Sequence, residues 1–338
     1  MYTQLILIIL FIYIFSKNTI TFPIHHTIYN IPFIKLCLGN PKQCFNFKIK
    51  TNVEISYIID YKYNKAGFNS ENSTTYKQIK SNYSEYYDEI GGRLLNGIFS
   101  SDILTDLNDT LILKDFRFYL ISSGYYSPQI DGVIGLSRNL NSDSFLKQLY
   151  NQDIIPNYNF ALISNKLIIG NSNEGFRNYG KLIFTKNYLY ESSLIKILYH
   201  NLHFYFSVDN ITSASFSPSA EVIFCPSFLY NKLIGTIFKS FILKNQCIVN
   251  QIDDNSSFLI CFKGIINENL GKIYFIFGKW NINFELNKLF FKYNKEKFKF
   301  AIIGMKNINK IILGSPFFSK YDIIFDNHNE FVIIKHNN

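Results

Sequence analysis

The sequence has few cysteines and lacks the spacing that cysteine-based metal sites need. Its five cysteines form no C-x-x-C pair and no cluster with histidine, so no zinc site is predicted. Histidines are equally dispersed: His25, His26, His200, His203, His328 and His336. The closest useful pair, in HNLH, lies in a stretch typical of a strand, where residues three apart point to opposite faces. We therefore expect no metal and no cofactor.

Dense basic segments are also missing, although the formal net charge is +9. Lysines occur singly among Ile, Asn, Phe and Tyr residues, and there is no arginine cluster. A nucleic-acid surface needs a concentrated basic patch. The pattern is instead typical of a solvated surface, and we expect no nucleic-acid partner.

Long apolar runs are limited to one, LILIILFIYIF from Leu5 to Phe15. It has the length of a signal-peptide core and is shorter than the roughly 20 residues of a membrane span. We interpret residues 1–20 as a signal peptide and expect the secretory pathway, meaning the extracellular space or a vesicular lumen. An uncleaved N-terminal anchor stays an alternative, because no Lys or Arg precedes the run and no small-x-small cleavage site follows it.

The cysteines that are present fit an oxidising compartment. Cys37 and Cys44 flank the turn-forming LGNPKQ, and we expect them to join two adjacent strands. Cys247 and Cys261 are expected to close a second small loop. Cys225 is then left over and is interpreted as a small buried hydrophobic residue.

Short apolar runs rich in Ile, Phe, Tyr and Val, broken by Gly, Asn and Asp, recur from about residue 28 to the end. They predict a mainly β protein. Helical periodicity is confined to Ser142–Gln152 and to the segment that begins at Pro226. Two features occur once in each half: a strand leading into a T-N-V or P-S-A turn, and later IDGVIGL or IILGSPFF. This order predicts two related lobes, residues 24–180 and 181–338.

Seven segments carry a family resemblance in a fixed order: IKLCLGNPKQCFNFKI, FNSENSTTYK, NGIFSSDILT, DGVIGL, SFLKQLYNQDIIP, LIIGNSNEGFRNYGKLIF and IILGSPFFSKYDIIFD. Over nearly all of residues 28–334 the chain resembles the pepsin-like aspartic proteases (peptidase family A1), including the plasmepsins and cathepsin D-like enzymes. The resemblance implies one bilobal acid-protease domain, with two related β-barrel-like lobes facing a cleft. It also implies aspartic-type endopeptidase chemistry.

That chemistry depends on two aspartates, one per lobe, each in an Asp-Thr/Ser-Gly turn. The pair shares one proton and holds a water, so that one carboxylate is the base while the other polarises the scissile carbonyl. Aligning the first hairpin places Lys50, followed by Thr51, where the first aspartate is expected. Counting back from Pro226 places Ser217 at the second position. The resemblance therefore implies that both catalytic aspartates are replaced.

The flap tyrosine of the family aligns with Ile90, followed by Gly91. We interpret the chain as a pseudoprotease in which the catalytic dyad is lost, and whose cleft residues are Lys50, Thr51, Ile90, Gly91 and Ser217. The expected partner is a peptide or protein ligand, and the expected state is a monomer. Lys50 is expected to donate to Ser217 Oγ or to attract an acidic group of a bound peptide.

Two alternatives stay open. One is an active endopeptidase in which Glu54 and Glu221, each four residues after the replaced aspartate, form a substitute dyad. The other is a different secreted β protein, either carbohydrate-binding or purely structural.

Overall fold

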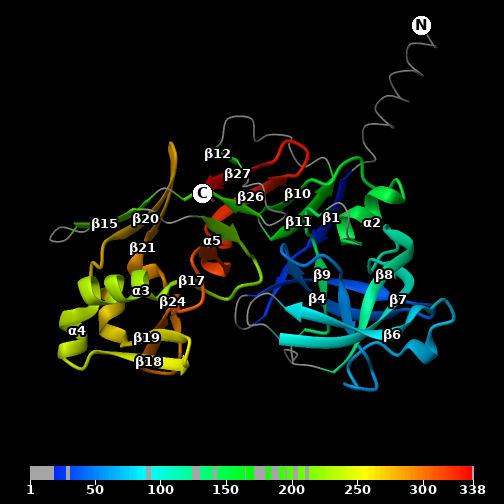
Figure 1. The fold of residues 1–338 in the computed structure, drawn as a ribbon, viewed down its shortest axis with the longest axis horizontal. Helices are drawn as coiled ribbons and strands as arrows, with labels where there is room; N and C mark the ends of the chain where they lie inside the picture. The colour runs from blue at the N-terminus through cyan, green and yellow to red at the C-terminus, as the bar shows by residue number, and fades with distance from the viewer. Residues whose placement is uncertain are drawn as a thin grey trace, which may run out of the picture. The chain divides into compact units, whose positions relative to one another are not determined.

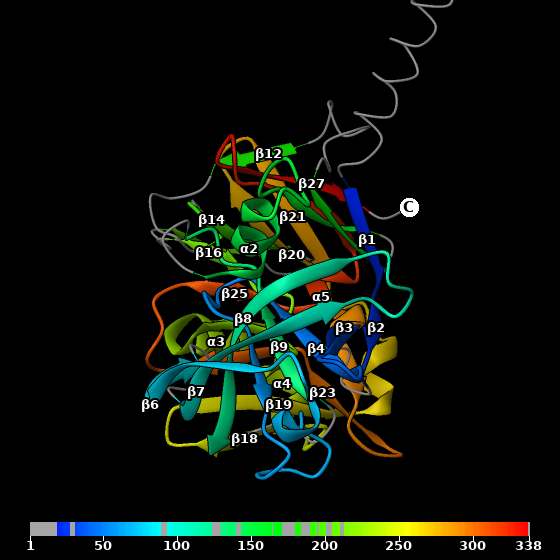
Figure 2. The same cartoon turned by 90° about the vertical axis from the view of Figure 1, so that its right-hand side faces the viewer.

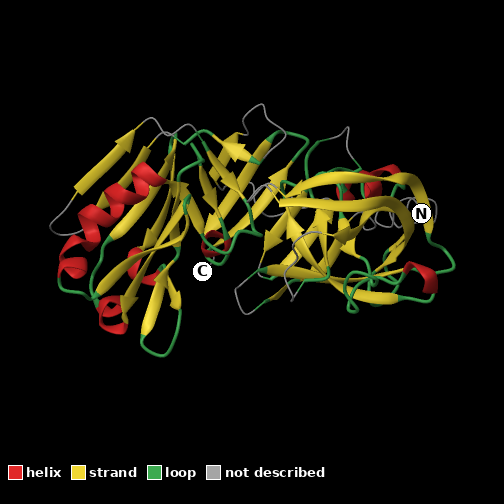
Figure 3. Cartoon of the chain, turned by 60° about the horizontal axis from the view of Figure 1, so that its bottom comes forward, coloured by secondary structure: helices red, strands yellow, loops and turns green. Residues whose placement is uncertain are grey.

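The computed structural model describes residues 19–27, 31–88, 93–123, 130–139, 143–163, 165–170, 180–183, 190–194, 196–200, 205–209 and 213–336. Strands predominate in this part of the chain and helices are short (Figure 3). The prediction of a mainly β protein is therefore confirmed.

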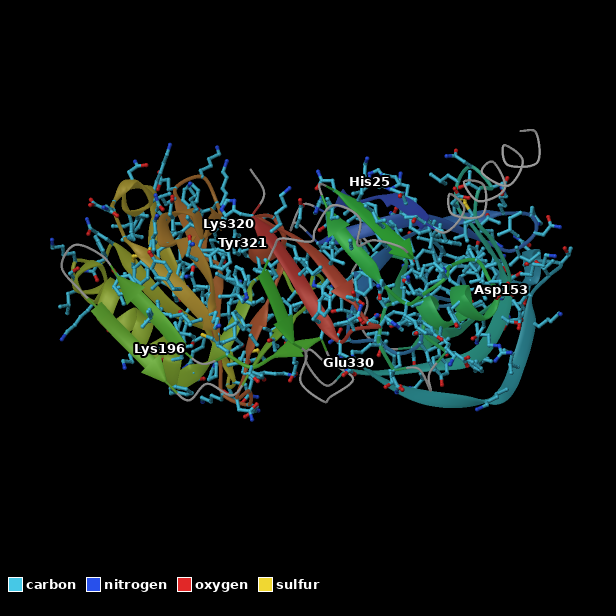
Figure 4. The ribbon with its side chains drawn as sticks, turned by 90° about the horizontal axis from the view of Figure 1, so that it is seen from above. His25, Asp153, Lys196, Lys320, Tyr321 and Glu330 are labelled. Atoms are coloured by element: carbon cyan, nitrogen blue, oxygen red, sulfur yellow. A yellow bond between two sulfur atoms is a disulfide. The ribbon has the colours of Figure 1, made fainter. Side chains whose placement is uncertain are left out.

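The chain divides into two compact units, residues 1–181 with 321–338, and residues 182–320. Lys320 and Tyr321, labelled in Figure 4, are the consecutive residues at which the chain returns to the first unit. Residues 321–338 were predicted to belong to the second lobe. Strand pairing places them in the first unit, because Phe325 pairs with Phe160. A local pattern does not reveal a partner so distant in sequence.

The first unit contains two sheets (Figure 1). An eight-stranded sheet has the order β2-β3-β4-β9-β5-β8-β7-β6. Its strands are β2 (His25–His26), β3 (Pro32–Leu38), β4 (Gln43–Lys50), β5 (Tyr57–Ile59), β6 (Lys77–Asp88), β7 (Arg93–Thr105), β8 (Ile112–Ser123) and β9 (Gly132–Gly135). Figure 2 shows β6, β7 and β8 side by side as long strands.

A six-stranded sheet has the order β1-β11-β10-β26-β27-β12. Its strands are β1 (Thr19–Pro23), β10 (Phe160–Ile163), β11 (Lys166–Gly170), β12 (Gly180–Ile183), β26 (Tyr321–Asp326) and β27 (Phe331–His336). Buried side chains from both halves of the sequence meet here, including Ala161 and Ile324.

Helix α2 (Phe145–Asn151) packs against β8, and a short 3-10 helix, η1 (Ser70–Asn72), precedes β6. The Ser144 side chain caps α2 by accepting a hydrogen bond from Lys147 N, and Phe145 meets Phe116 edge to face. Gln148 binds β8 next to the residues that pair with β5, since its side chain accepts a hydrogen bond from Arg117 N and donates one to Arg117 O. The predicted helix is thus confirmed, three residues later at its start than expected.

The second unit contains a nine-stranded sheet with the order β13-β16-β25-β17-β24-β19-β23-β22, in which β18 pairs with β19. Its strands are β13 (Glu191–Ser192), β16 (Ala214–Phe216), β17 (Ile223–Pro226), β18 (Cys247–Asp253), β19 (Ser256–Phe262), β22 (Phe290–Lys292), β23 (Lys297–Phe300), β24 (Ile302–Met305) and β25 (Ile311–Leu313). A four-stranded sheet consists of β14 (Lys196–His200), β15 (Tyr205–Asp209), β20 (Lys272–Phe277) and β21 (Trp280–Glu285).

A continuous helical segment covers one face of the nine-stranded sheet. It consists of α3 (Ser227–Leu233), the π-helical η2 (Ile234–Phe238) and α4 (Lys239–Leu243). Phe238 packs against Phe290 at 6.1 Å and Phe300 at 5.2 Å between ring centroids. The helix predicted to begin at Pro226 is confirmed, with Pro226 as its N-cap residue. The remaining short helices are η3 (Lys263–Asn267), η4 (Leu286–Lys288) and α5 (Ser315–Phe318).

Two disulfides join adjacent strands, Cys37–Cys44 between β3 and β4 and Cys247–Cys261 between β18 and β19. Both predicted pairings are confirmed, and they indicate an oxidising compartment. Cys225 is a free cysteine, only 1% exposed, and burial raises the pKa of its thiol. A raised pKa disfavours the thiolate, so this cysteine is poorly suited to act as a nucleophile.

Candidate functional site

The same arrangement of four strands occurs once in each unit. In the first, β4 runs parallel to β9, β9 antiparallel to β5, and β5 parallel to β8. In the second, β16 runs parallel to β25, β25 antiparallel to β17, and β17 parallel to β24. The two repeated sequence features, IDGVIGL and IILGSPFF, therefore supply the same strand of the two arrangements, β9 and β25.

Lys50 is the last residue of the first strand in this arrangement. Phe47 and Ile49 are fully buried on one face of β4, as the period of two dictates. Lys50 belongs by the same alternation to the face of Lys48, yet it is only 3% exposed. It is in register with Gly135, and its carbonyl accepts a hydrogen bond from Leu136 N at 2.8 Å.

Ser217 follows the corresponding strand of the second unit. Phe216 is in register with Leu313, and Ser217 N donates to Leu313 O at 3.0 Å. Continuing the register sets Ser217 opposite Gly314. Ser217 is 3% exposed, and its Oγ lies 3.3 Å from Ser219 Oγ.

The two glycines show that Lys50 and Ser217 occupy equivalent positions. A Cβ on Gly135 would lie 2.5 Å from the carbonyl oxygen of Val53, three residues after Lys50. A Cβ on Gly314 would lie 2.5 Å from the carbonyl oxygen of Ala220, three residues after Ser217. In both units the turn after the first strand is pressed against a glycine that has no room for a side chain.

These turns contain an ammonium and hydroxyls but no carboxylate in their first four residues, Lys-Thr-Asn-Val and Ser-Pro-Ser-Ala. Thr51 is 1% exposed, and Pro218 is buried. The nearest following carboxylates, Glu54 and Glu221, are both exposed. Glu54 accepts a hydrogen bond from Asn139 Nδ2 at 2.8 Å on the surface of the first unit.

Ile90 and Gly91, predicted to cover the cleft, lie outside the described residues. The strands on either side of them are described, with Asp88 in register with Arg93. Their assignment to the site stays a prediction.

Two lysines of β23, Lys297 and Lys299, form a group with neighbouring aromatic rings that was not predicted. The lysines were interpreted as scattered, but KFKF, residues 297–300, alternates lysine with phenylalanine at a period of two. This alternation places Lys297 and Lys299 on one face of β23. Lys299 Nζ lies 4.4 Å from the centroid of the Phe258 ring, and burial lowers the pKa of Lys299.

Within the part of the chain that the structure describes, no group of three or more His, Cys, Asp or Glu side chains is placed to hold a metal ion. In the same residues, which begin at Thr19, no helix is long and apolar enough to cross a membrane. The predicted signal peptide lies almost entirely before them. No model of a known protein family matches the chain, and no curated protein matches it.

Proposed function

We propose that the chain is a secretory-pathway homologue of the pepsin-like aspartic proteases that does not hydrolyse peptide bonds and instead binds peptides or protein segments. The observation that carries this proposal is the equivalence of Lys50 and Ser217 in two matching strand arrangements. The pepsin-like family, by the resemblance of the sequence, has an aspartate at each of these positions. The two disulfides support the proposed compartment.

The substitutions remove both halves of the acid–base pair. An ammonium carries a positive charge where the family needs a carboxylate that can accept a proton, and a serine hydroxyl is a poor base near neutral pH. Neither residue can activate water in the way that one carboxylate of the pair does, while the other polarises the carbonyl. The folded turn is kept, since Lys50 and Ser217 are both buried.

The alternative is an active aspartic-type endopeptidase that uses Glu54 and Glu221. Both side chains are exposed, whereas a catalytic acid–base pair is usually held away from bulk water. Glu54 is moreover engaged by Asn139. The exposure of both carboxylates and the hydrogen bond to Glu54 favour an inactive protein over a protease with a Glu54–Glu221 dyad.

Two assays on the purified protein test the proposal: a peptide-library cleavage screen from about pH 3 to pH 8, the range in which carboxylates and histidines titrate, and binding of a statine-type inhibitor. We expect neither cleavage nor inhibitor binding. Cleavage that the inhibitor blocks would overturn the proposal.

The Glu54→Gln and Glu221→Gln variants are the matched controls. Cleavage that either substitution abolishes would establish the substitute dyad. Cleavage that neither substitution nor the inhibitor changes, and that stays with the protein through repeated purification, would also overturn the proposal.

A further inference from the structure

The outer part of the second unit's large sheet has one covered face and one open face. Lys299 is in register with Phe291 on β22 and Ile260 on β19, and Ile260 is in register with Ile248 on β18. Because side chains alternate along a strand, residues two apart share a face. This face, called the Lys–Phe face below, is formed by Ile248, Asn250, Phe258, Ile260, Phe262, Phe291, Lys297 and Lys299. Ile260, between Ile248 and Lys299, is buried, and the side chains around it are more exposed.

The opposite face of β19 and β23 is a core. Leu259 and Phe300 are fully buried there, and Phe238 of the helical segment packs on Phe300. On the Lys–Phe face, by contrast, Phe262 and Phe291 are each 38% exposed and Ile248 is 44% exposed. A solvated sheet face normally carries polar side chains, whereas this one exposes apolar side chains next to two lysines.

Two cations lie among these rings. Lys297 Nζ is 5.3 Å from the Phe262 ring centroid, and Lys299 Nζ is 4.4 Å from that of Phe258 and 5.8 Å from that of Phe291. Each ammonium is therefore held over an aromatic ring in cation–π geometry.

Within the described residues, neither Lys297 nor Lys299 has a carboxylate oxygen within 4.0 Å. Burial, the larger effect, lowers the pKa of Lys299, while the negative charge of Glu221 raises it. A partly desolvated ammonium without a carboxylate is stabilised when an anionic group pairs with it.

We propose that the Lys–Phe face binds an extended acidic segment of another polypeptide, whose carboxylates pair with Lys297 and Lys299 while its apolar side chains cover the exposed rings. Lys297 and Lys299 are two residues apart on one strand, so they are about 7 Å apart. Residues two apart in an extended ligand have the same spacing, which lets two acidic side chains on one side of the ligand meet both lysines.

The exposed side chain of Ile248 favours a polypeptide over other classes of anionic ligand. A sulfated polysaccharide or a single-stranded nucleic acid supplies negative charge but no aliphatic side chain to cover it, whereas a polypeptide supplies both. The inference rests on the proposed function only in taking a polypeptide as the ligand. It involves none of the turn residues Lys50 and Ser217.

The test is fluorescence anisotropy of the purified protein with a labelled peptide of about 12 residues in which Glu alternates with Leu and Ser. A peptide of the same length with Lys in place of Glu is the charge control. We expect binding of the acidic peptide alone, weakened as salt rises from about 50 to 300 mM. In the Lys297→Glu/Lys299→Glu variant, affinity should fall at least tenfold.

Two further variants keep the result interpretable. Lys297→Met/Lys299→Met keeps the apolar stems and should also lose at least tenfold in affinity. Lys239→Glu changes an exposed lysine on α4, on the covered side of the sheet, and should bind as the wild type does.

Several outcomes would overturn the inference: no binding of the acidic peptide, equal binding of the lysine peptide, or equal weakening by Lys239→Glu. Tighter binding of heparin or of a single-stranded oligonucleotide, lost in the same lysine variants, would assign the face to a different macromolecule. Cleavage of the bound peptide would overturn the proposed function and leave the inference about the face intact.

Discussion

Substituting Gly314 by alanine tests the tight contact that defines the turn after Ser217. The backbone at Gly314 has φ −99°, which any residue adopts, so the cost is steric. An added Cβ would lie 2.1 Å from Val222 O and 2.5 Å from Ala220 O, and neither backbone atom can rotate away. Overpacking of this kind costs about 3 kcal/mol. Weakening the 2.7 Å hydrogen bond from Ser315 N to Ala220 O adds about 1 kcal/mol.

We therefore expect Gly314→Ala to lower the free energy of unfolding by about 4 kcal/mol, which corresponds to a drop in Tm of about 12 °C for a unit of this size. Gly235→Ala is the matched control, because nothing lies within 4 Å of its added Cβ in the π-helical segment. It should stabilise the protein by about 0.5–1 kcal/mol. Urea unfolding and calorimetry measure both. A Gly314→Ala protein within about 1 kcal/mol of wild type would refute the reasoning.

Three other predictions concern buried or partly buried side chains. Lys310→Met should lower the free energy of unfolding by about 3 kcal/mol, because it removes the ion-pair partner of Glu191, which is 5% exposed. Adding Glu191→Gln should recover most of this loss. A double-mutant cycle measured by urea unfolding in which the two losses are additive would contradict the prediction. In a thiol-reagent assay, the native protein should show no reactive thiol, and the urea-unfolded protein should show one, that of Cys225. A thiol that reacts in the native state would argue against the burial of Cys225. Burial raises the pKa of Asp131 despite a hydrogen bond from Asn46 N, so the folded protein holds this proton more tightly than the unfolded chain. The resulting stabilisation is fully present below the pKa of Asp131 in the unfolded chain, and it is lost as pH rises through the pKa in the folded protein. Asp131→Asn should therefore raise Tm relative to wild type more at pH 7 than at pH 3. The reverse order would count against a raised pKa for Asp131.

Cross-strand contacts with a short sequence separation were predictable, and longer ones were not. Cys37 and Cys44 flank a turn, so their pairing followed from local pattern. The pairing of β26 with β10 was not predicted, because an apolar strand near the C-terminus has the same sequence pattern in either sheet. Glu191 and Lys310 were not singled out either, since 119 residues separate the two members of this buried pair.

For the candidate site, sequence alignment identified Lys50 and Ser217. The matching strand arrangements, and the contact of each following turn with Gly135 or Gly314, gave their equivalence a geometric basis. The alternation of Lys and Phe in β23 was visible in the sequence, but its meaning was not. A period of two says that lysines and rings lie on opposite faces of one strand; only the neighbouring strands bring Phe258, Phe262 and Phe291 beside the lysines.

By itself, the sequence determined the strand-rich character, the position of the main helices, both disulfides and the absence of carboxylates from the two turns, because each depends on neighbouring residues or on residue identity. The tertiary structure decided which strands are partners, which lysines are buried and which rings stay exposed. Those properties depend on contacts between segments far apart in the chain, and the burial of Lys50 at the end of an otherwise alternating strand is the clearest case.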